Sequence, residues 1–328
     1  MERSINCIKN NDGFALILTI LIISLIVVLT LQFNTSMWSN LHSASNFRDG
    51  TRLECIARSG LNCALSFLLE DAEKTDFDSL HEGWSDMKDF SSKSDSFFDE
   101  GRFVVKILDL SGRIQINQLV DQNGRYNKIQ KDFLMRFMSS EQFGLDSKEV
   151  DKILDNIKDW IDSDDEPTRF GAESSYYQAL EGPYSCKNAP MEFIEELLLV
   201  KGITKELFYG TEEKPGISRY LTVYGEGKIN INTADSLVLK SLSAQIDKEM
   251  VGNMVTYRKD EDNSLKDPNW YKKVPEMSHV AIDSSLVTTL STNFEINSQG
   301  SKEAMTAQVT GVVERKGKDL QILSWKVE

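Results

Sequence analysis

The sequence predicts an α+β protein with a long N-terminal helix, a small antiparallel sheet, and a large helical domain inserted between the strands of that sheet. Three observations predict this class. An apolar N-terminal segment continues into an amphipathic pattern at helical spacing. Strand-like runs follow that helix and return at the C-terminus. The stretch between the two groups of strands has helical spacing instead.

The N-terminal segment is long enough to cross a membrane. Residues 14–31 are almost wholly apolar, and no Asp, Glu, Lys or Arg occurs between Asp12 and Arg48. At about 1.5 Å per residue, a helix of this length just spans a bilayer core of about 30 Å. A cleaved secretory signal fits poorly, because the nearest small-x-small triplet, at 43–45, lies too far downstream. A plain single-pass anchor fits the length equally well.

Residues 14–118 are predicted to hold this helix and the first strands. Apolar residues recur at helical spacing beyond the membrane, through Phe47, Ile56 and Phe67, and indicate an amphipathic helix that ends near Glu70. The segment 73–99 has the composition of a loop. The runs RFVVKILDL and RIQINQL follow it, and the Ser-Gly pair between them predicts a hairpin.

Residues 119–290 are predicted to form the inserted helical domain, and residues 291–328 the strands that complete the sheet. Helical spacing occurs at 128–143, and Asp146 to Glu149 form a plausible capping box for a helix that reaches Trp160. Pro190 indicates the first turn of a further helix, which Gly202 would end. Two more helical patterns lie at 233–242 and 247–259. The C-terminal strands turn at residues 317–318.

Charge and cysteine content exclude several classes of function. The net charge of -14 disfavours binding to phosphate backbones, so no nucleic-acid partner is expected. Cys55 and Cys63 would lie about 12 Å apart along one helix, too far for a disulfide. A long-range bridge from Cys186 stays open. The three histidines are scattered and form no zinc pattern, and no motif of a known catalytic class is present, so the chain is not expected to be an enzyme.

The densest cluster of acidic residues lies in the run DWIDSDDEPTRFGAESSYY, residues 159–177. Five acids fall within eight residues, and Glu173 follows a turn supplied by Pro167 and Gly171. Calcium prefers several hard oxygen ligands in a flexible loop, and Asp162-x-Asp164 has a suitable spacing. The loop lacks the full EF-hand pattern. From these residues alone, a calcium loop and a merely solvated acidic loop both remain open.

A second motif, residues 228–259, resembles a helix-hairpin-helix unit. Such units present backbone amides to DNA phosphate from a Gly-hydrophobic-Gly hairpin. Here both glycines are absent, and Asp247 stands where an anion would bind. The segment is therefore interpreted as a packing module in which Asn230, Asn232 and Thr233 cap backbone groups.

The N-terminus NDGFALILTILIISLIVVLTL resembles a prepilin leader, residues 1–13, that is cut between Gly13 and Phe14. Most pilins and pseudopilins have glutamate as the fifth mature residue, and this chain has Leu18. The acidic run, Gly171-Ala172-Glu173, the Tyr176-Tyr177 pair and Asn188-Ala189-Pro190 occur in the order found in K-type minor pseudopilins of type II secretion systems. The chain resembles that family along nearly its whole length.

The resemblance implies a pilin-like fold and a place at the tip of the pseudopilus, where the subunit helps initiate assembly and export of folded proteins. The partners implied are the I-type and J-type minor pseudopilins, other pseudopilus subunits and the prepilin peptidase, with Phe47, Ile56 and Phe67 against partner helices. It also implies structural calcium, held by Asp162, Asp164, Asp165 and Glu173. The chain would be a single-pass inner-membrane protein whose C-terminal domain lies in the periplasm.

Two alternatives share much of this organisation. One is a single-pass inner-membrane protein whose periplasmic domain binds calcium or another ligand, with no role in a filament. The other is a minor pilin of a type IV pilus, which would also be processed after Gly13. The helical insert and Leu18 favour the K type over a type IV pilin.

Overall fold

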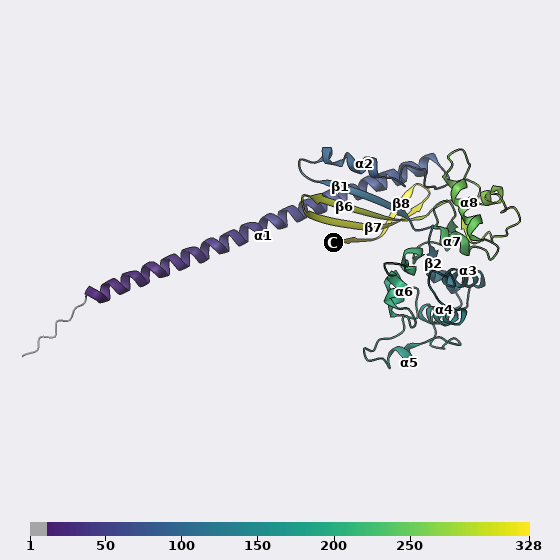
Figure 1. The fold of residues 1–328 in the computed structure, drawn as a ribbon, viewed down its shortest axis with the longest axis horizontal. Helices are drawn as coiled ribbons and strands as arrows, with labels where there is room; N and C mark the ends of the chain where they lie inside the picture. Colours follow the sequence, from purple (N-terminus) through teal and green to yellow (C-terminus); the bar gives the residue numbers. More distant parts are fainter. Residues whose placement is uncertain (1–11) are drawn as a thin grey trace, which may run out of the picture.

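The computed structural model describes residues 12–328 and begins with one long helix, α1 (Asp12–Lys74). The predicted helix is confirmed, and it ends four residues beyond Glu70. Its N-terminal half stands clear of the rest of the chain, while its C-terminal part lies along a sheet (Figure 1). The apolar stretch is long enough to cross a membrane, and none of it is buried. Most of the expected leader, residues 1–11, lies outside the described residues.

The sheet has four antiparallel strands in the order β1-β6-β7-β8. Their bounds are Arg102–Asp109 (β1), Asn293–Lys302 (β6), Met305–Lys316 (β7) and Asp319–Val327 (β8). The C-terminal part of α1 packs on one face, where residues such as Leu53, Phe103 and Ile296 form a core. The helix approaches closely because Gly300 has no side chain: a Cβ there would lie 2.3 Å from the Leu53 carbonyl oxygen. This arrangement confirms the α+β class.

The predicted hairpin after α1 is wrong. β1 pairs along its whole length with β6, and the following strand β2 (Ile114–Gln115) pairs in parallel with β3 (Leu221–Thr222). The reason is burial, because the side chains of Ile114 and Ile116 are fully buried in the core of the helical insert. The insert therefore begins soon after β1, several residues before the predicted boundary at 119.

The insert is built from short elements around its own hydrophobic core. Its helices are α3 (Lys128–Met138), α4 (Ser147–Ile161), α5 (Ser174–Tyr177), α6 (Lys205–Tyr209), α7 (Ser236–Ser241) and α8 (Lys248–Lys259). Short 3-10 helices and the two-stranded pair β4 (Ile229–Asn230) and β5 (Val287–Thr288) connect them. The helix predicted after Pro190 is only a 3-10 turn, η3 (Ile194–Leu199), because most of its side chains stay partly exposed and only Leu197 is buried.

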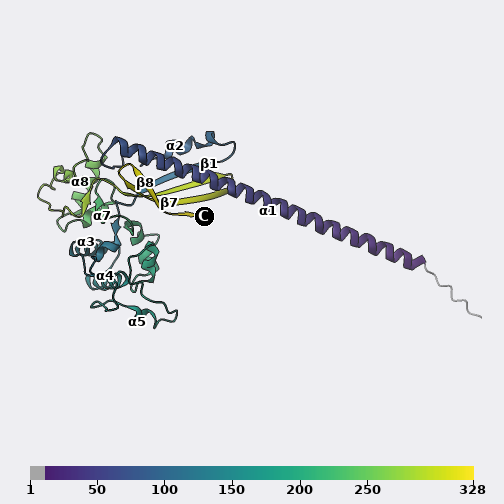
Figure 2. The same cartoon turned by 180° about the vertical axis from the view of Figure 1, so that it is seen from behind.

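The insert lies beyond the end of the sheet, on the side away from the apolar half of α1 (Figures 1 and 2). The chain leaves β1, builds the insert and returns into β6, and both views show the C-terminus beside the sheet. Two small helical segments, α2 (Lys88–Ser92) and η1 (Ser94–Phe97), lie against β1. The protein thus places a helical domain at the far end of a membrane-length helix.

Candidate metal centre

Helix α4 supplies the fixed side of a cluster of carboxylates. Its N-terminus has the predicted capping box, in which Asp146 accepts hydrogen bonds from the first-turn amides and Glu149 binds back to the Asp146 amide. Asp159 and Asp162 lie three residues apart at the other end, and residues with this spacing share a helix face. Both side chains therefore project toward the loop that follows α4.

The loop after α4 folds back over the helix end. The Thr168 amide donates to both carboxylate oxygens of Asp159, at 3.1 and 3.0 Å, and the Phe170 amide donates to Asp155 at 3.2 Å. Gly171 passes so close that a Cβ there would lie 1.8 Å from Asp159 Oδ2. Only glycine permits this approach, which brings Glu173 onto the other two carboxylates.

Three carboxylates converge at this point. Oxygens of Asp159, Asp162 and Glu173 all lie within 4.8 Å of one another, and the three residues are at most 2% exposed. Within residues 12–328, Asp162 Oδ1 and both carboxylate oxygens of Glu173 are buried without a hydrogen-bond partner. Buried polar atoms without hydrogen-bond partners are rare in folded proteins, so these three oxygens are candidate ligands for a cation.

The cluster carries more negative charge than its neighbours balance. Lys158 contacts Asp162 and lies 3.8 Å from Asp159, so one cation lies against two of the three carboxylates. Burial, followed by repulsion from Asp159 and Asp162, raises the pKa of Glu173 to about 8. Burial also raises the pKa values of Asp159 and Asp162. A divalent cation would offset the remaining charge.

The expected ligand set is only partly brought together. Asp162 and Glu173 meet, but Asp164 and Asp165 are exposed and do not belong to the convergent group. The side-chain amide of Asn188 ties this part of the loop, donating to the Asp164 carbonyl oxygen at 2.6 Å and to Asp165 at 3.3 Å. Asp159 was not among the predicted ligands, although its helical spacing from Asp162 could have indicated it.

The residues expected at a filament interface have different environments. Phe14, Leu18 and Phe47 on α1 are exposed, Phe47 to 78%. Ile56 is 2% exposed because it packs in the core between α1 and the sheet, so its prediction as a partner contact is corrected. The Phe67 ring is partly buried, 5.0 Å from the ring of Phe90. Phe47 and Phe67 remain as expected partner contacts, and of these two only Phe47 has a fully exposed side chain.

The cysteines of the described residues form no disulfide. Cys55, Cys63 and Cys186 are all free thiols. The Cys186 thiol is buried beside the carboxylate cluster and donates to the Asp159 carbonyl oxygen at 3.3 Å. Burial raises the pKa of this thiol to about 12. Cys186 therefore serves as a small buried side chain that supports the end of α4.

The chain is similar to proteins of one secretion family. Residues 112–212, which contain the carboxylate cluster, match the family model described as type II secretion system (T2SS), protein K. The chain is 28% identical over 269 residues to type II secretion system protein K of Pseudomonas aeruginosa, a match that covers 79% of this chain and 76% of the relative. It is 23% identical over 210 residues to the protein K of Aeromonas hydrophila, covering 61% of each chain.

A third relative, the protein K of Pectobacterium carotovorum subsp. carotovorum, is 34% identical over 93 residues, or 28% of each chain. The match thus spans 61% of the length of the Aeromonas hydrophila protein and 28% of the length of the Pectobacterium protein. In fold, it is similar to a chain of the crystal structure titled the GspK-GspI-GspJ complex from the enterotoxigenic Escherichia coli Type 2 Secretion System. That similarity has a TM-score of 0.68 at 16% identity and covers 87% of this chain and 99% of the other.

Proposed function

We propose that the chain is a minor pseudopilin at the tip of the secretion pseudopilus, because it is similar to type II secretion system K proteins in sequence and matches their family model over residues 112–212. One observation carries the proposal: a membrane-length helix leads through a four-stranded sheet to a bulky insert at its far end. The apolar residues of the first half of α1 are exposed, as a helix that packs into a bilayer or a filament requires. The role is structural rather than catalytic.

The position in the filament follows from Leu18 and from the insert. In a filament of such helices, an acid at the fifth mature position neutralises the N-terminal amine of a neighbour, because an unpaired charge inside apolar packing is costly. Leu18 supplies no such acid. The insert lies beyond the sheet, where a further subunit would have to stack. A subunit of this shape suits the filament end, from which it would initiate assembly.

We propose I-type and J-type minor pseudopilins as its direct partners, since the similar solved chain belongs to a GspK-GspI-GspJ complex. Phe47, on the exposed part of α1 between the apolar segment and the sheet, is the contact residue proposed for them. Other pseudopilus subunits and the prepilin peptidase complete the proposed set. The proposed location is the inner membrane, with one span and the sheet and insert in the periplasm.

We also propose that the carboxylate cluster holds structural calcium. The unpartnered oxygens of Asp162 and Glu173, with Asp159 beside them, form the hard anionic donor set that calcium prefers. When bound, the ion would supply two positive charges at the cluster. Asp159 lies in the last turn of α4 and Asp162 caps its C-terminus, whereas Glu173 comes from the folded-back loop, so shared ligation would fasten that loop to the helix end. Asp164 and Asp165 would contribute through their charge at the exposed side.

The first experiment is mass spectrometry of the N-terminal peptide of the protein from native membranes. A mature terminus at methylated Phe14 is the expected result, because the peptidase cuts after Gly13. An intact leader would exclude both the pseudopilin and the type IV pilin, and would leave an ordinary membrane anchor. Coelution with I-type and J-type subunits then separates the pseudopilin from a type IV minor pilin.

A further inference from the structure

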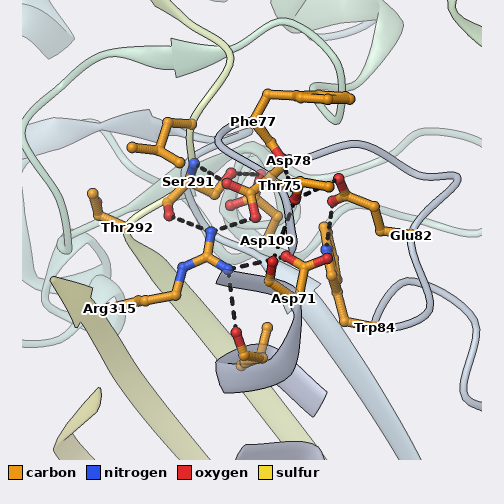
Figure 3. A network of polar contacts seen from close by, with 12 residues as sticks. Asp71, Thr75, Phe77, Asp78, Glu82, Trp84, Asp109, Ser291, Thr292 and Arg315 are labelled. Atoms are coloured by element: carbon orange, nitrogen blue, oxygen red, sulfur yellow. Dashed lines mark hydrogen bonds and ion pairs between the residues drawn. The ribbon is translucent and has the colours of Figure 1, made fainter. Parts of the chain in front are cut away.

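Polar contacts join the sheet domain to the insert. Their buried hydrophobic residues form two separate cores. Between these cores lies a group of four carboxylates and one guanidinium, here named the junction network (Figure 3). Its members are Asp71, Asp78, Glu82, Asp109 and Arg315. They come from α1, from the loop after α1, from β1 and from β7.

Arg315 is the centre of the junction network. Its side chain is 4% exposed and donates to Asp71 at 3.2 Å and to a carboxylate oxygen of Asp78. It also donates to the Ser291 carbonyl oxygen at 3.1 Å, where the chain returns from the insert into β6. The guanidinium therefore connects the end of α1, the following loop and the returning chain (Figure 3).

Asp78 attaches this network to the insert. Its second carboxylate oxygen accepts from the Ser291 amide at 2.6 Å, and its own amide donates to the Thr289 carbonyl oxygen at 2.7 Å. Its carbonyl oxygen accepts from the side-chain amides of Asn230 and Asn232, at 3.2 and 3.0 Å. Two polar residues of the helix-hairpin-helix-like segment are thus used to hold the loop after α1.

Asp109 makes the second attachment, at the point where β1 ends. One of its oxygens accepts from the hydroxyls of Thr233 and Ser291, both at 2.5 Å, and the other accepts from the Ser111 amide at 2.7 Å. A cavity of about 420 Å³ lies against Asp109 and Arg113, between the sheet domain and the insert.

The junction network has an imbalance of charge. Of the four carboxylates, Asp71 and Asp78 pair with Arg315, and Arg113 lies near Asp109 and Glu295. Burial, then repulsion from Glu82 and Asp78, raises the pKa of Asp71 to about 7 despite the nearby guanidinium. Burial raises the pKa of Asp109 to about 6, and it also raises the pKa values of Asp78 and Glu82. Each of these groups binds a proton more tightly in the closed junction than it would in water.

We propose that the junction network is a proton-linked clasp, in which proton uptake holds the insert against the sheet domain and proton release loosens it. The sign follows from linkage, because a carboxylate that binds its proton more tightly in the closed state favours closure at low pH. That advantage is complete below the ordinary carboxylate pKa of about 4. It is lost as the pH rises through 6 and 7, where Asp109 and Asp71 ionise.

Hydrogen exchange of the full chain in detergent tests the clasp. The amides of Asp78 and Ser291 report on it directly, because both bond across the junction. After correction for the intrinsic pH dependence of exchange, their protection should fall about tenfold or more between about pH 5 and about pH 8. With calcium present at both pH values, so that the carboxylate cluster does not add its own pH dependence, amides of α4, in the core of the insert, should keep their protection.

Two matched variants separate the clasp from a general change in stability. Asp71→Asn removes the charge and keeps an oxygen toward Arg315, so it should flatten the pH dependence at the junction. Glu70→Gln, its exposed neighbour on the same helix, should behave like the wild type. If Asp71→Asn does not fold, Asp109→Asn gives the same test from β1. Equal protection at both pH values, equal effects of the two α1 variants, or a loss that spreads to α4 would overturn the proposal.

Discussion

Glutamine in place of Glu173 should stabilise the calcium-free protein and destabilise the calcium-bound protein. Without calcium, Glu173 has an ordinary pKa of 4.5 in the unfolded chain and of about 8 in the folded chain, so folding near pH 7 requires proton uptake. One pKa unit corresponds to about 1.36 kcal/mol, so the full cost approaches about 3 kcal/mol. Water at the loop surface screens part of the repulsion, so the gain from glutamine is about 1 to 3 kcal/mol.

With calcium, the sign reverses because glutamine removes an anionic ligand. Affinity should weaken at least about tenfold, and each tenfold loss removes about 1.4 kcal/mol of calcium-linked stabilisation. The raised pKa also means that the calcium-free wild type binds more protons when folded than when unfolded between about pH 4.5 and about pH 8. Its stability should therefore decrease as the pH rises across that window, and Glu173→Gln should reduce the slope.

Thermal unfolding of the full chain, followed by tryptophan fluorescence with a chelator and with calcium, measures both effects. Trp160 reports on the site because its ring lies 5.3 Å from Tyr177, close to the acidic loop. About 2 to 4 °C per kcal/mol is expected for a unit of this size. Glu166→Gln, the same change at an exposed acid of the loop, is the control. A Glu173→Gln variant that melts lower than the wild type in chelator as well would refute the reasoning.

Two further predictions concern the partner surface and the loop. Phe47→Asp should reduce copurification with I-type and J-type subunits without lowering the melting temperature, because Phe47 is exposed. Ile56→Ala should instead cost about 2 to 5 kcal/mol of stability, because Ile56 is buried. Unfolding of Phe47→Asp would contradict this prediction. Gly171→Ala should abolish calcium-dependent melting, because the added Cβ would lie 1.8 Å from Asp159 Oδ2. Gly182→Ala is the control and should keep calcium-dependent melting, because there is open space around Gly182. Equal melting curves for the two glycine variants would count against the site.

Local sequence patterns predicted those elements whose formation is decided locally. The continuous periodicity of α1 needs no partner to be recognised, and the capping box at Asp146 satisfies its own helix end. The C-terminal strands follow the same rule, since the Gly317-Lys318 turn joins β7 directly to β8. Each of these features depends on neighbours a few residues away, and each was confirmed.

The hairpin after α1 failed because strand pairing is settled by distant residues. Ser111 and Gly112 have the composition of a hairpin turn, but β1 takes its antiparallel partner from β6, on the other side of the insert. Ile114 and Ile116 gain more by burial in the insert core than they would on an edge strand. No pattern within the segment shows where its apolar side chains will be buried.

The metal-ligand prediction stays a prediction, and the structure brings together two of its four residues, Asp162 and Glu173, for a reason that bears on how the site would work. The acidic run drew attention to Asp164 and Asp165, whose spacing suits a loop that turns inward. The loop instead turns at Thr168 and Gly171, and these residues bring Glu173 to the end of α4. Two carboxylates of the cluster are therefore fixed by a helix that the capping box and a hydrophobic core already hold. The third depends on the loop, so the ordering of that loop should set the affinity for calcium.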